Sequence, residues 1–343
     1  MITVVSMNPS IDLTYNIPTL ARGQSHRVSV VRQDIAGKAV NNVLALSNLG
    51  LPCRLVGFDF IQNGDLLKKP LDEAKIPHDL TKTNGAIRTN IKIFEEETGI
   101  MTEINQEGQH VPEKDIRALV DKIANYTTNT SEITNEITNE VTCEMLILSG
   151  SLPQGVPTDI YAQIIKSINT SKTPGKTPTG KTPPSKTPII VDTSGPALLS
   201  AISALKKGPH FIKPNLQELE STCGQKLPTR DSQISTCRFL LHKYNGLKAI
   251  CLSLGEQGAL MIGREEAFFA PAMDIKVRGV QGAGDSMVAG IAAALYESPT
   301  TPLDALLLYA MAAAAASLIL EGTQMVTKEG FTKMMSQVQV RPL

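Results

Sequence analysis

The sequence contains no tryptophan, and aromatic residues make up only 4% of its 343 positions. Its hydrophobic content is nevertheless 42%, so a sizeable core is available and is built mainly from aliphatic side chains. No charge of either sign is in excess, because 33 Lys and Arg residues balance 33 Asp and Glu residues. A protein that binds nucleic acid needs a basic surface, so the composition argues against that class of partner.

Cysteine is scarce, and long apolar runs are missing. The five cysteines include no C-x-x-C pair, which is typical of reduced, mostly buried thiols in a cytosol. The longest apolar run, residues 305–320, is rich in alanine and shorter than the ~20 residues that cross a membrane. It predicts a buried core helix. The N-terminus begins in a strand-like run without a charged leader, so we expect a cytoplasmic protein with no membrane role.

Short apolar runs alternate with amphipathic helical segments along most of the chain. This order is typical of a parallel sheet that carries helices on both faces, and ligands bind such sheets at the carboxyl ends of the strands. Strands are predicted at 2–5, 54–56, 145–148, 189–191, 211–212 and 249–252, and helices at 40–49, 63–74, 113–126, 158–168, 196–206, 216–223 and 231–244.

Four stretches interrupt this order. Residues 12–32 and 87–105 alternate polar with apolar side chains, which indicates antiparallel strands. We interpret them as one small sheet that covers the ligand site or pairs with a second subunit; two ordinary surface hairpins are the alternative. Residues 127–142 and 169–188 are low-complexity insertions, the second with four Lys-Thr-Pro repeats, and we expect surface loops there.

A glycine turn opens a long apolar helix in the last quarter of the chain. Gly282 and Gly284 allow the backbone to bend tightly and to approach a ligand. The N–H groups from about Ala283 to Ser286 then form an anion site at the positive end of the helix dipole. Asp285 lies within this site, where a carboxylate can serve as a base beside a phosphoryl group. The alternative is that Asp285 only favours the start of a helix.

Two further groups of polar residues follow the first strand. Asp12 comes shortly after it, where a carboxylate can bind two hydroxyl groups of a sugar; a simple capping role is the alternative. The turn Gly37-Lys38 opens the next helix, and Asn41 follows with an amide that can donate and accept at once. A glycine-lysine turn at a helix start favours recognition of phosphate or hydroxyl groups.

Six motifs occur in one order along the whole chain, apart from the two insertions. Together they resemble the ribokinase-like (phosphofructokinase B type) sugar kinases, in the branch that holds the 1-phosphofructokinases and tagatose-6-phosphate kinases. The motifs are Asn8-Pro9-Ser10-Ile11-Asp12, Gly37-Lys38 with Asn41, Ser149-Gly150-Ser151-Leu152-Pro153, Lys213-Pro214-Asn215 with Glu218, Ser253-Leu254-Gly255 with Gly258, and Gly282-Ala283-Gly284-Asp285.

The resemblance implies a single domain, 1–343, that is an α/β three-layer sandwich with a mostly parallel central sheet and a small β-sheet lid. It implies a homodimer through that lid and ATP-dependent, Mg²⁺-dependent phosphorylation of D-fructose 1-phosphate to fructose 1,6-bisphosphate. A tagatose-6-phosphate kinase is the alternative, and a non-catalytic sugar-phosphate sensor on the same fold is a second one. In this family the residue matching Asp285 is the base, and the backbone of Gly282, Ala283 and Gly284 holds the migrating phosphoryl charge.

The resemblance also implies a nucleotide site. Lys213, Asn215 and Glu218 match the segment that faces the phosphates, and Glu218 would act on Mg²⁺ through water. An N-cap with a capping box is the structural alternative for Asn215 and Glu218. The resemblance further implies that a glycine-rich turn contacts the nucleotide. This turn consists of Ser253, Leu254, Gly255, Glu256, Gln257 and Gly258.

The substrate side is implied in the same way. Asp12, Gly37, Lys38 and Asn41 match residues that contact the sugar, and Ser149 is expected to line the same cleft. Arg88, Asn90 and Lys92 alternate along a strand, so their side chains share one face. Two cations on one face suit a phosphate already present on the sugar, and a solvated strand face is the alternative. The combination of Arg88 and Lys92 resembles the pattern of 1-phosphofructokinases, since we expect an apolar residue in place of Lys92 in tagatose-6-phosphate kinases.

Overall fold

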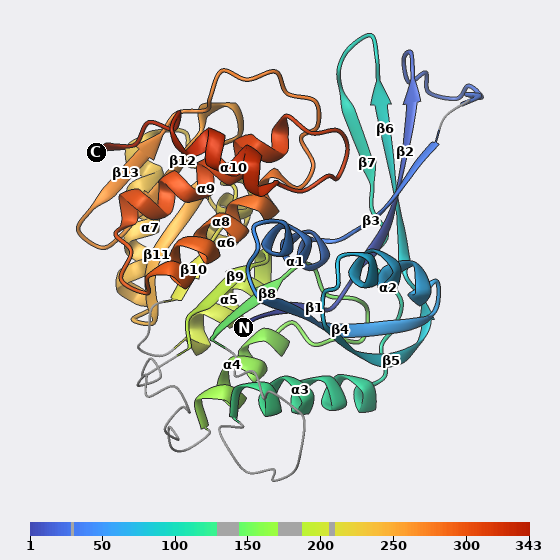
Figure 1. Cartoon of the computed structure of the whole chain (residues 1–343), viewed down its shortest axis with the longest axis horizontal. Helices are drawn as coiled ribbons and strands as arrows, with labels where there is room; N and C mark the ends of the chain where they lie inside the picture. The colour runs from blue at the N-terminus through green and yellow to red at the C-terminus, as the bar shows by residue number, and fades with distance from the viewer. Residues whose placement is uncertain (29–30, 129–143, 171–186, 206–209) are drawn as a thin grey trace.

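The computed structural model describes residues 1–28, 31–128, 144–170, 187–205 and 210–343. A large, mostly parallel sheet crosses this part of the chain, and helices cover it (Figure 1). Seven neighbouring strands are parallel, and three at one edge are antiparallel. In spatial order the strands are β14 (Arg341–Pro342), β13 (Ala267–Ala270), β12 (Ala259–Ile262), β11 (Leu247–Ser253), β10 (His210–Ile212), β9 (Ile189–Asp192), β8 (Met145–Ser149), β1 (Ile2–Ser6), β4 (Cys53–Gln62) and β5 (His78–Ala86).

Two rows of helices sandwich the large sheet, so the three-layer prediction is confirmed. One row contains α1 (Lys38–Asn48), α2 (Gly64–Glu73), α8 (Ala283–Glu297), α9 (Leu303–Leu318) and α10 (Lys328–Met335). The other contains α3 (Glu113–Thr128), α4 (Ile160–Thr170), α5 (Gly195–Ala204), α6 (Leu216–Cys223) and α7 (Arg230–Lys243).

A second, smaller sheet stands apart from the body and rises beside it in Figure 1. Its strand order is β3 (Val31–Ala36), β2 (Ser10–Ile17), β6 (Arg88–Glu95) and β7 (Met101–Ile104). The two stretches that interrupted the helix–strand order therefore pair in one sheet. Residues 29–30, which fell in an expected strand, lie outside the described residues, as do most of the two low-complexity insertions.

Local chemistry accounts for most of these elements. β1 and β8 are buried at every position, as expected for central strands with helices on both faces. α9 begins after Pro302 and buries most of its alanine-rich surface, which matches the expected core helix. The pattern missed helix α10 and several strands at the edges of the large sheet: β5 is polar and only partly buried, and β12 to β14 form an antiparallel extension.

The absences noted in the sequence have structural counterparts. Three of the four described cysteines are buried, and no disulfide joins any of the four. Within the described ranges, every helix is too short or too polar to cross a lipid bilayer.

Candidate active site

A cleft of about 490 Å³ lies between the small sheet and the carboxyl ends of the central strands. Residues from both sheets and from the first turns of α1 and α8 line it. Parallel sheets bind ligands at this edge. Of the residues predicted from the sequence, the cleft brings together Asp12, Gly37, Lys38, Asn41, Arg88, Asn90, Lys92, Ser149, Glu218, Gly282 and Asp285.

The first turn of α8 forms one wall of the cleft. Gly282 precedes the helix with φ of 74°, a left-handed conformation that favours glycine. The N–H groups of Ala283, Gly284 and Asp285 fall in the first turn, where the helix supplies no carbonyl partner. The prediction that the N–H of Ser286 also belongs to this group was wrong, because it already donates to the carbonyl of Gly282 at 2.8 Å. The candidate anion site is therefore one residue shorter than predicted.

Asp285 is only 8% exposed, yet it is one of the residues that line the cleft. Asn41 on α1 donates from Nδ2 to Asp285 Oδ2 at 2.7 Å. The other amide atom, Asn41 Oδ1, is buried without a hydrogen-bond partner among the described residues. Asn41 thus orients the carboxylate and keeps an unused hydrogen-bond acceptor.

Two lysines and two further carboxylates surround this aspartate. Lys38 Nζ lies 3.2 Å from Asp192 Oδ1 and 3.0 Å from Glu218 Oε1. Lys213 Nζ lies 3.5 Å from the same Asp192 oxygen. Burial lowers the pKa of Lys38, but the three carboxylates of Asp192, Glu218 and Asp285 outweigh it and raise that pKa overall. Lys38 is therefore a fixed, charged group in the cleft, and Lys213 approaches the same Asp192 carboxylate.

The same surroundings raise the pKa of Asp285 to about 6 from an ordinary value of 3.8. Burial is the largest cause, and the negative charge of Asp192 adds to it; Lys38, the hydrogen bond from Asn41 and Lys213 act in the opposite direction. A carboxylate with a pKa near the working pH is well matched to accepting a proton. This shift and the anion site point to the same chemistry.

The small sheet supplies the opposite wall. Asp12 on β2 accepts hydrogen bonds from Asn90 Nδ2 at 2.9 Å and from its neighbour Ser10 Oγ at 2.8 Å. Its second oxygen lies 2.6 Å from Lys92 Nζ. The shared face predicted for Arg88, Asn90 and Lys92 is present, since all three line the cleft. Lys92, however, points its charge at Asp12.

Arg88 lines the cleft like Lys38 and Lys92, but it has no carboxylate partner of its own among the described residues. Its Nη1 donates to the carbonyl of Gln106 at 2.9 Å, and Nε is buried with no hydrogen-bond partner in the described part of the chain. Burial lowers the pKa of Arg88, and Asp12 partly offsets this. An incompletely paired cation in such a place is suited to an anionic ligand.

The predicted nucleotide residues lie beside the cleft, and most of them do not line it. Ser253 pairs with Asn215 in an isolated parallel bridge, so the two segments are adjacent. Leu254 N–H donates to the carbonyl of Gly258 at 2.8 Å, which closes the turn. The three residues between them, Gly255 to Gln257, are exposed. Lys213 comes close to Gly284, at 3.2 Å from the position a Cβ would take there, and so links this edge to the anion site.

The capping box proposed as an alternative for Asn215 and Glu218 is present. Glu218 Oε2 accepts from the N–H of Asn215 at 2.9 Å, while Oε1 contacts Lys38.

Among the described residues, no three His, Cys, Asp or Glu side chains are arranged to hold a metal ion. A site for Mg²⁺ needs fewer protein ligands, because this ion keeps several waters and binds one or two carboxylates together with nucleotide phosphates. Glu218 is the carboxylate that would hold it through water, and Mg²⁺ would neutralise phosphate charge there.

The sequence reasoning missed Asp192, which is fully buried and paired with both lysines. A signal was available, because Asp192 ends β9 and the following Thr193 and Ser194 line the cleft. The rule that placed Asp12 at a strand's carboxyl end also applies here. Asn8 was quoted only as part of a motif, yet it lines the cleft and donates to Ser151 Oγ at 3.1 Å.

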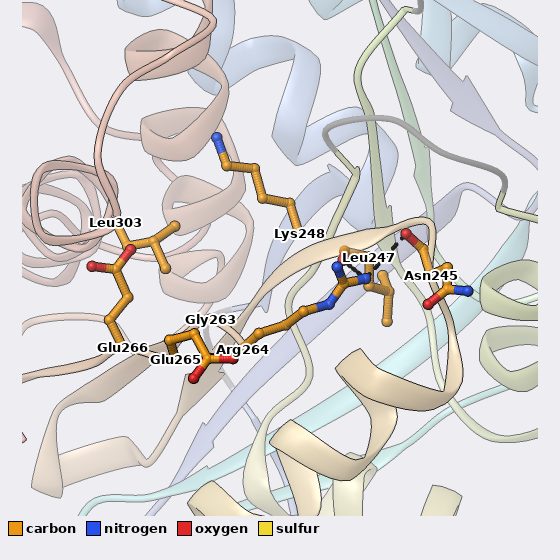
Figure 2. A pocket seen from close by; sticks show the side chains of 8 residues that line it. All are labelled: Asn245, Leu247, Lys248, Gly263, Arg264, Glu265, Glu266 and Leu303. Carbon is orange, nitrogen blue, oxygen red and sulfur yellow. Dashed lines mark hydrogen bonds between the residues drawn. The ribbon is translucent and has the colours of Figure 1, made fainter.

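A second hollow, of about 540 Å³, lies at the other end of β11 (Figure 2). Arg264 fills part of it and donates to the carbonyls of Asn245 and Leu247 at 3.2 and 3.4 Å. None of the residues predicted for a site lines it. It lies at the amino end of a strand, away from the edge where ligands of such sheets bind, so the first cleft remains the candidate active site.

Comparison with known proteins agrees with this geometry. The family model described as pfkB family carbohydrate kinase matches residues 3–329. The chain belongs to this family. The pfkB assignment confirms the resemblance stated from the motifs and makes the protein a sugar kinase.

Among relatives of this pfkB protein, a 1-phosphofructokinase of Xanthomonas campestris is 28% identical over 297 residues, covering 86% of this chain and 84% of the relative. Two solved structures share the fold. Phosphofructokinase-2 of Escherichia coli has a TM-score of 0.80 at 23% identity, with 98% of each chain covered. A Thermotoga maritima protein described as a possible 1-phosphofructokinase has a TM-score of 0.81 at 20% identity, covering 100% of this chain and 99% of the other.

Proposed function

We propose that the protein transfers the terminal phosphoryl group of ATP to a hydroxyl group of D-fructose 1-phosphate, which yields fructose 1,6-bisphosphate and ADP. The observation that carries the proposal is the position of Asp285, a buried carboxylate with a raised pKa at the start of α8, in one cleft with Asp12 and Arg88. The 1-phosphofructokinase from Xanthomonas campestris supports the choice of sugar.

The steps follow from the groups in the cleft. Asp285 takes the proton of the acceptor hydroxyl, whose oxygen forms a bond to the terminal phosphorus while the bond to the ADP oxygen breaks. The first-turn N–H groups of α8, with Lys38 and Lys213 nearby, stabilise negative charge on the phosphoryl oxygens. Asp12 binds hydroxyl groups of the sugar, and Asn41 Oδ1 offers one further acceptor.

The phosphate already on the sugar is assigned to Arg88. Its Nε is buried and without a partner among the described residues, so a phosphate oxygen would complete its hydrogen bonding. Lys38 and Lys92 are each held by carboxylates at 2.6–3.2 Å. Of these three cations in the cleft, Arg88 would therefore gain the most hydrogen bonding from a bound phosphate.

The raised pKa of Asp285 predicts an acid limit of activity. The base must be ionised to accept a proton, so kcat/KM for the sugar at saturating ATP should halve near pH 6 and fall about tenfold for each further unit. The profile is to be measured with fructose 1-phosphate and with unphosphorylated fructose, which carries no group titrating near pH 6. A limit near pH 4 with both sugars would contradict the pKa shift.

The proposed activity is tested by ADP release from ATP with a panel of acceptors: fructose 1-phosphate, tagatose 6-phosphate, fructose 6-phosphate and unphosphorylated fructose. We expect the highest kcat/KM with fructose 1-phosphate. A preference for tagatose 6-phosphate would favour the alternative kinase. Binding of a sugar phosphate without ADP release would favour a non-catalytic sensor.

We also propose that the small sheet joins two copies of this chain. The face turned away from the cleft carries Leu13, Tyr15, Ile91 and Ile93 in register, and Ile104 at its edge is 56% exposed. Apolar surface of this kind is stabilised by a partner. Sedimentation analysis should show a dimer, which Ile104→Lys weakens; the control Ile61→Lys, at an exposed residue of β4, should leave it intact. A monomeric unaltered protein would refute this proposal.

A further inference from the structure

Lys92 has an unexpected choice of partner in the small sheet. Its neighbour in register on the antiparallel strand β7 is Glu103, the usual cross-strand partner for a lysine. The ammonium nevertheless lies 2.6 Å from Asp12 Oδ2 and 4.0 Å from the Glu103 carboxylate. The side chains of Lys92 and Asp12 are 9% and 5% exposed, so this is a buried ion pair rather than a surface contact.

Three donors from the small sheet hold Asp12 in place. Ser10 and Asn90 donate to Oδ1, and Lys92 contacts Oδ2. The carboxylate of Asp34, which faces Asp12 in register on β3, is paired with Arg32 at 2.7 Å. Three donors occupy only part of the capacity of a carboxylate, which accepts about four hydrogen bonds. The orientation of Asp12 is therefore fixed before a ligand arrives, with room left for a hydroxyl group.

We propose that Lys92 is a positioning residue: it holds Asp12 in place and neutralises its charge, so that Asp12 can bind sugar hydroxyls while Arg88 takes the phosphate of the sugar. This inference rests on the proposed function of the cleft. It replaces the earlier expectation that Lys92 binds the phosphate itself. For Lys92 to do so, the 2.6 Å contact would have to break and leave a buried carboxylate without its counter-charge.

Pre-organisation explains why such a pair is useful in this cleft. An uncompensated carboxylate would repel a substrate that carries two negative charges, whereas the neutralised pair still accepts hydrogen bonds. A carboxylate that is already fixed loses little rotamer freedom when the sugar binds. Lys92 then contributes to sugar recognition through Asp12.

The test is a double-mutant cycle with Asp12→Asn, Lys92→Met and the double variant. The double variant keeps the net charge of the unaltered protein. Each single variant should lower kcat/KM for fructose 1-phosphate by about 10²-fold through KM for the sugar, with KM for ATP unchanged. The double variant should be within about threefold of Asp12→Asn, because Lys92 then has no carboxylate to hold. The exposed Lys82→Met on β5 is the matched control.

If Lys92 contacts the phosphate directly, the two losses multiply in the double variant, and the effect of Lys92→Met disappears with unphosphorylated fructose. Either result overturns the inference. Urea unfolding of the same variants tests the pair without any substrate: the unfolding midpoint should fall in each single variant and fall no further in the double, and additive changes would refute the pairing. This arm remains decisive if no ketose phosphate is turned over, an outcome that would remove only the proposed function.

Discussion

Asp285→Asn is expected to reduce kcat by at least about 10³-fold, because the side chain no longer accepts the proton of the acceptor hydroxyl. Binding should change little: an asparagine can still accept from Asn41 Nδ2, which lies 2.7 Å from the present carboxylate. Steady-state ADP release gives the loss of kcat, and calorimetric titration gives the affinity for nucleotide and sugar phosphate. The combination of lost turnover and retained binding separates a catalytic base from a binding residue.

The same substitution should make the protein more stable. The pKa of Asp285 is about 6 in the fold and 3.8 ordinarily, so its ionised form opposes folding. That cost is absent below pH 4, grows between pH 4 and 6, and reaches on the order of 1–3 kcal/mol above pH 6. Thermal unfolding at pH 7 should therefore show a midpoint raised by a few degrees, and at pH 4 no difference.

The control for both effects is Asp304→Asn, since Asp304 also lies in the first turn of a helix but is exposed. It should leave turnover unchanged and should not stabilise the protein. Turnover of Asp285→Asn above a tenth of the original value would remove Asp285 from the role of base. A lower unfolding midpoint at pH 7 would contradict the raised pKa.

Arg88→Met should raise KM for fructose 1-phosphate by about 10²- to 10³-fold with a small change in kcat. The guanidinium can donate two charge-assisted hydrogen bonds to a phosphate, each worth about 1.5–3 kcal/mol. Methionine keeps much of the side-chain volume, so the fold should be unchanged. Initial-rate measurements over a range of sugar concentrations provide KM and kcat separately.

Unphosphorylated fructose provides the internal comparison for Arg88, because KM for that sugar should change by less than about threefold. Arg117→Met is the control variant, at an exposed residue of α3. An equal loss with both sugars would mean that Arg88 holds the small sheet in place and does not recognise the phosphate.

Much of the layer architecture could be predicted because it rests on local patterns. The apolar strands and their following helices are each defined by a few consecutive residues, and most of them lie within a few positions of the prediction, whereas β4 runs on to Gln62, well beyond the predicted end at residue 56. The start of α8 was predicted from two glycines and an aspartate, and the shared face of Arg88, Asn90 and Lys92 from the two-residue repeat of a strand.

The rest depended on contacts between distant parts of the chain. Asp192 ends a short buried strand, and its pairing with Lys38 and Lys213, which come from other elements, becomes visible only in the fold. The partner of Lys92 follows from the parallel register of β2 and β6, which joins residues 78 positions apart. β5 carries too few apolar residues to be recognised as a strand without its neighbour β4.

Asn42 illustrates how such a contact changes an interpretation. It is a polar residue on a buried face of α1, where an apolar side chain would be the simple expectation. In the structure it is fully buried and donates from Nδ2 to Ser149 Oγ at 2.8 Å, at the end of β8. The partner satisfies the amide donor, and it fixes a serine that lines the cleft.

The most direct test is a crystal structure of Asp285→Asn with fructose 1-phosphate and a non-hydrolysable ATP analogue. We predict the acceptor hydroxyl within about 2.6–3.2 Å of the side chain at position 285, in line with the terminal phosphate of the analogue, and the phosphate of the sugar at Arg88. A sugar whose acceptor hydroxyl faces another carboxylate, or that binds outside the cleft, would contradict it.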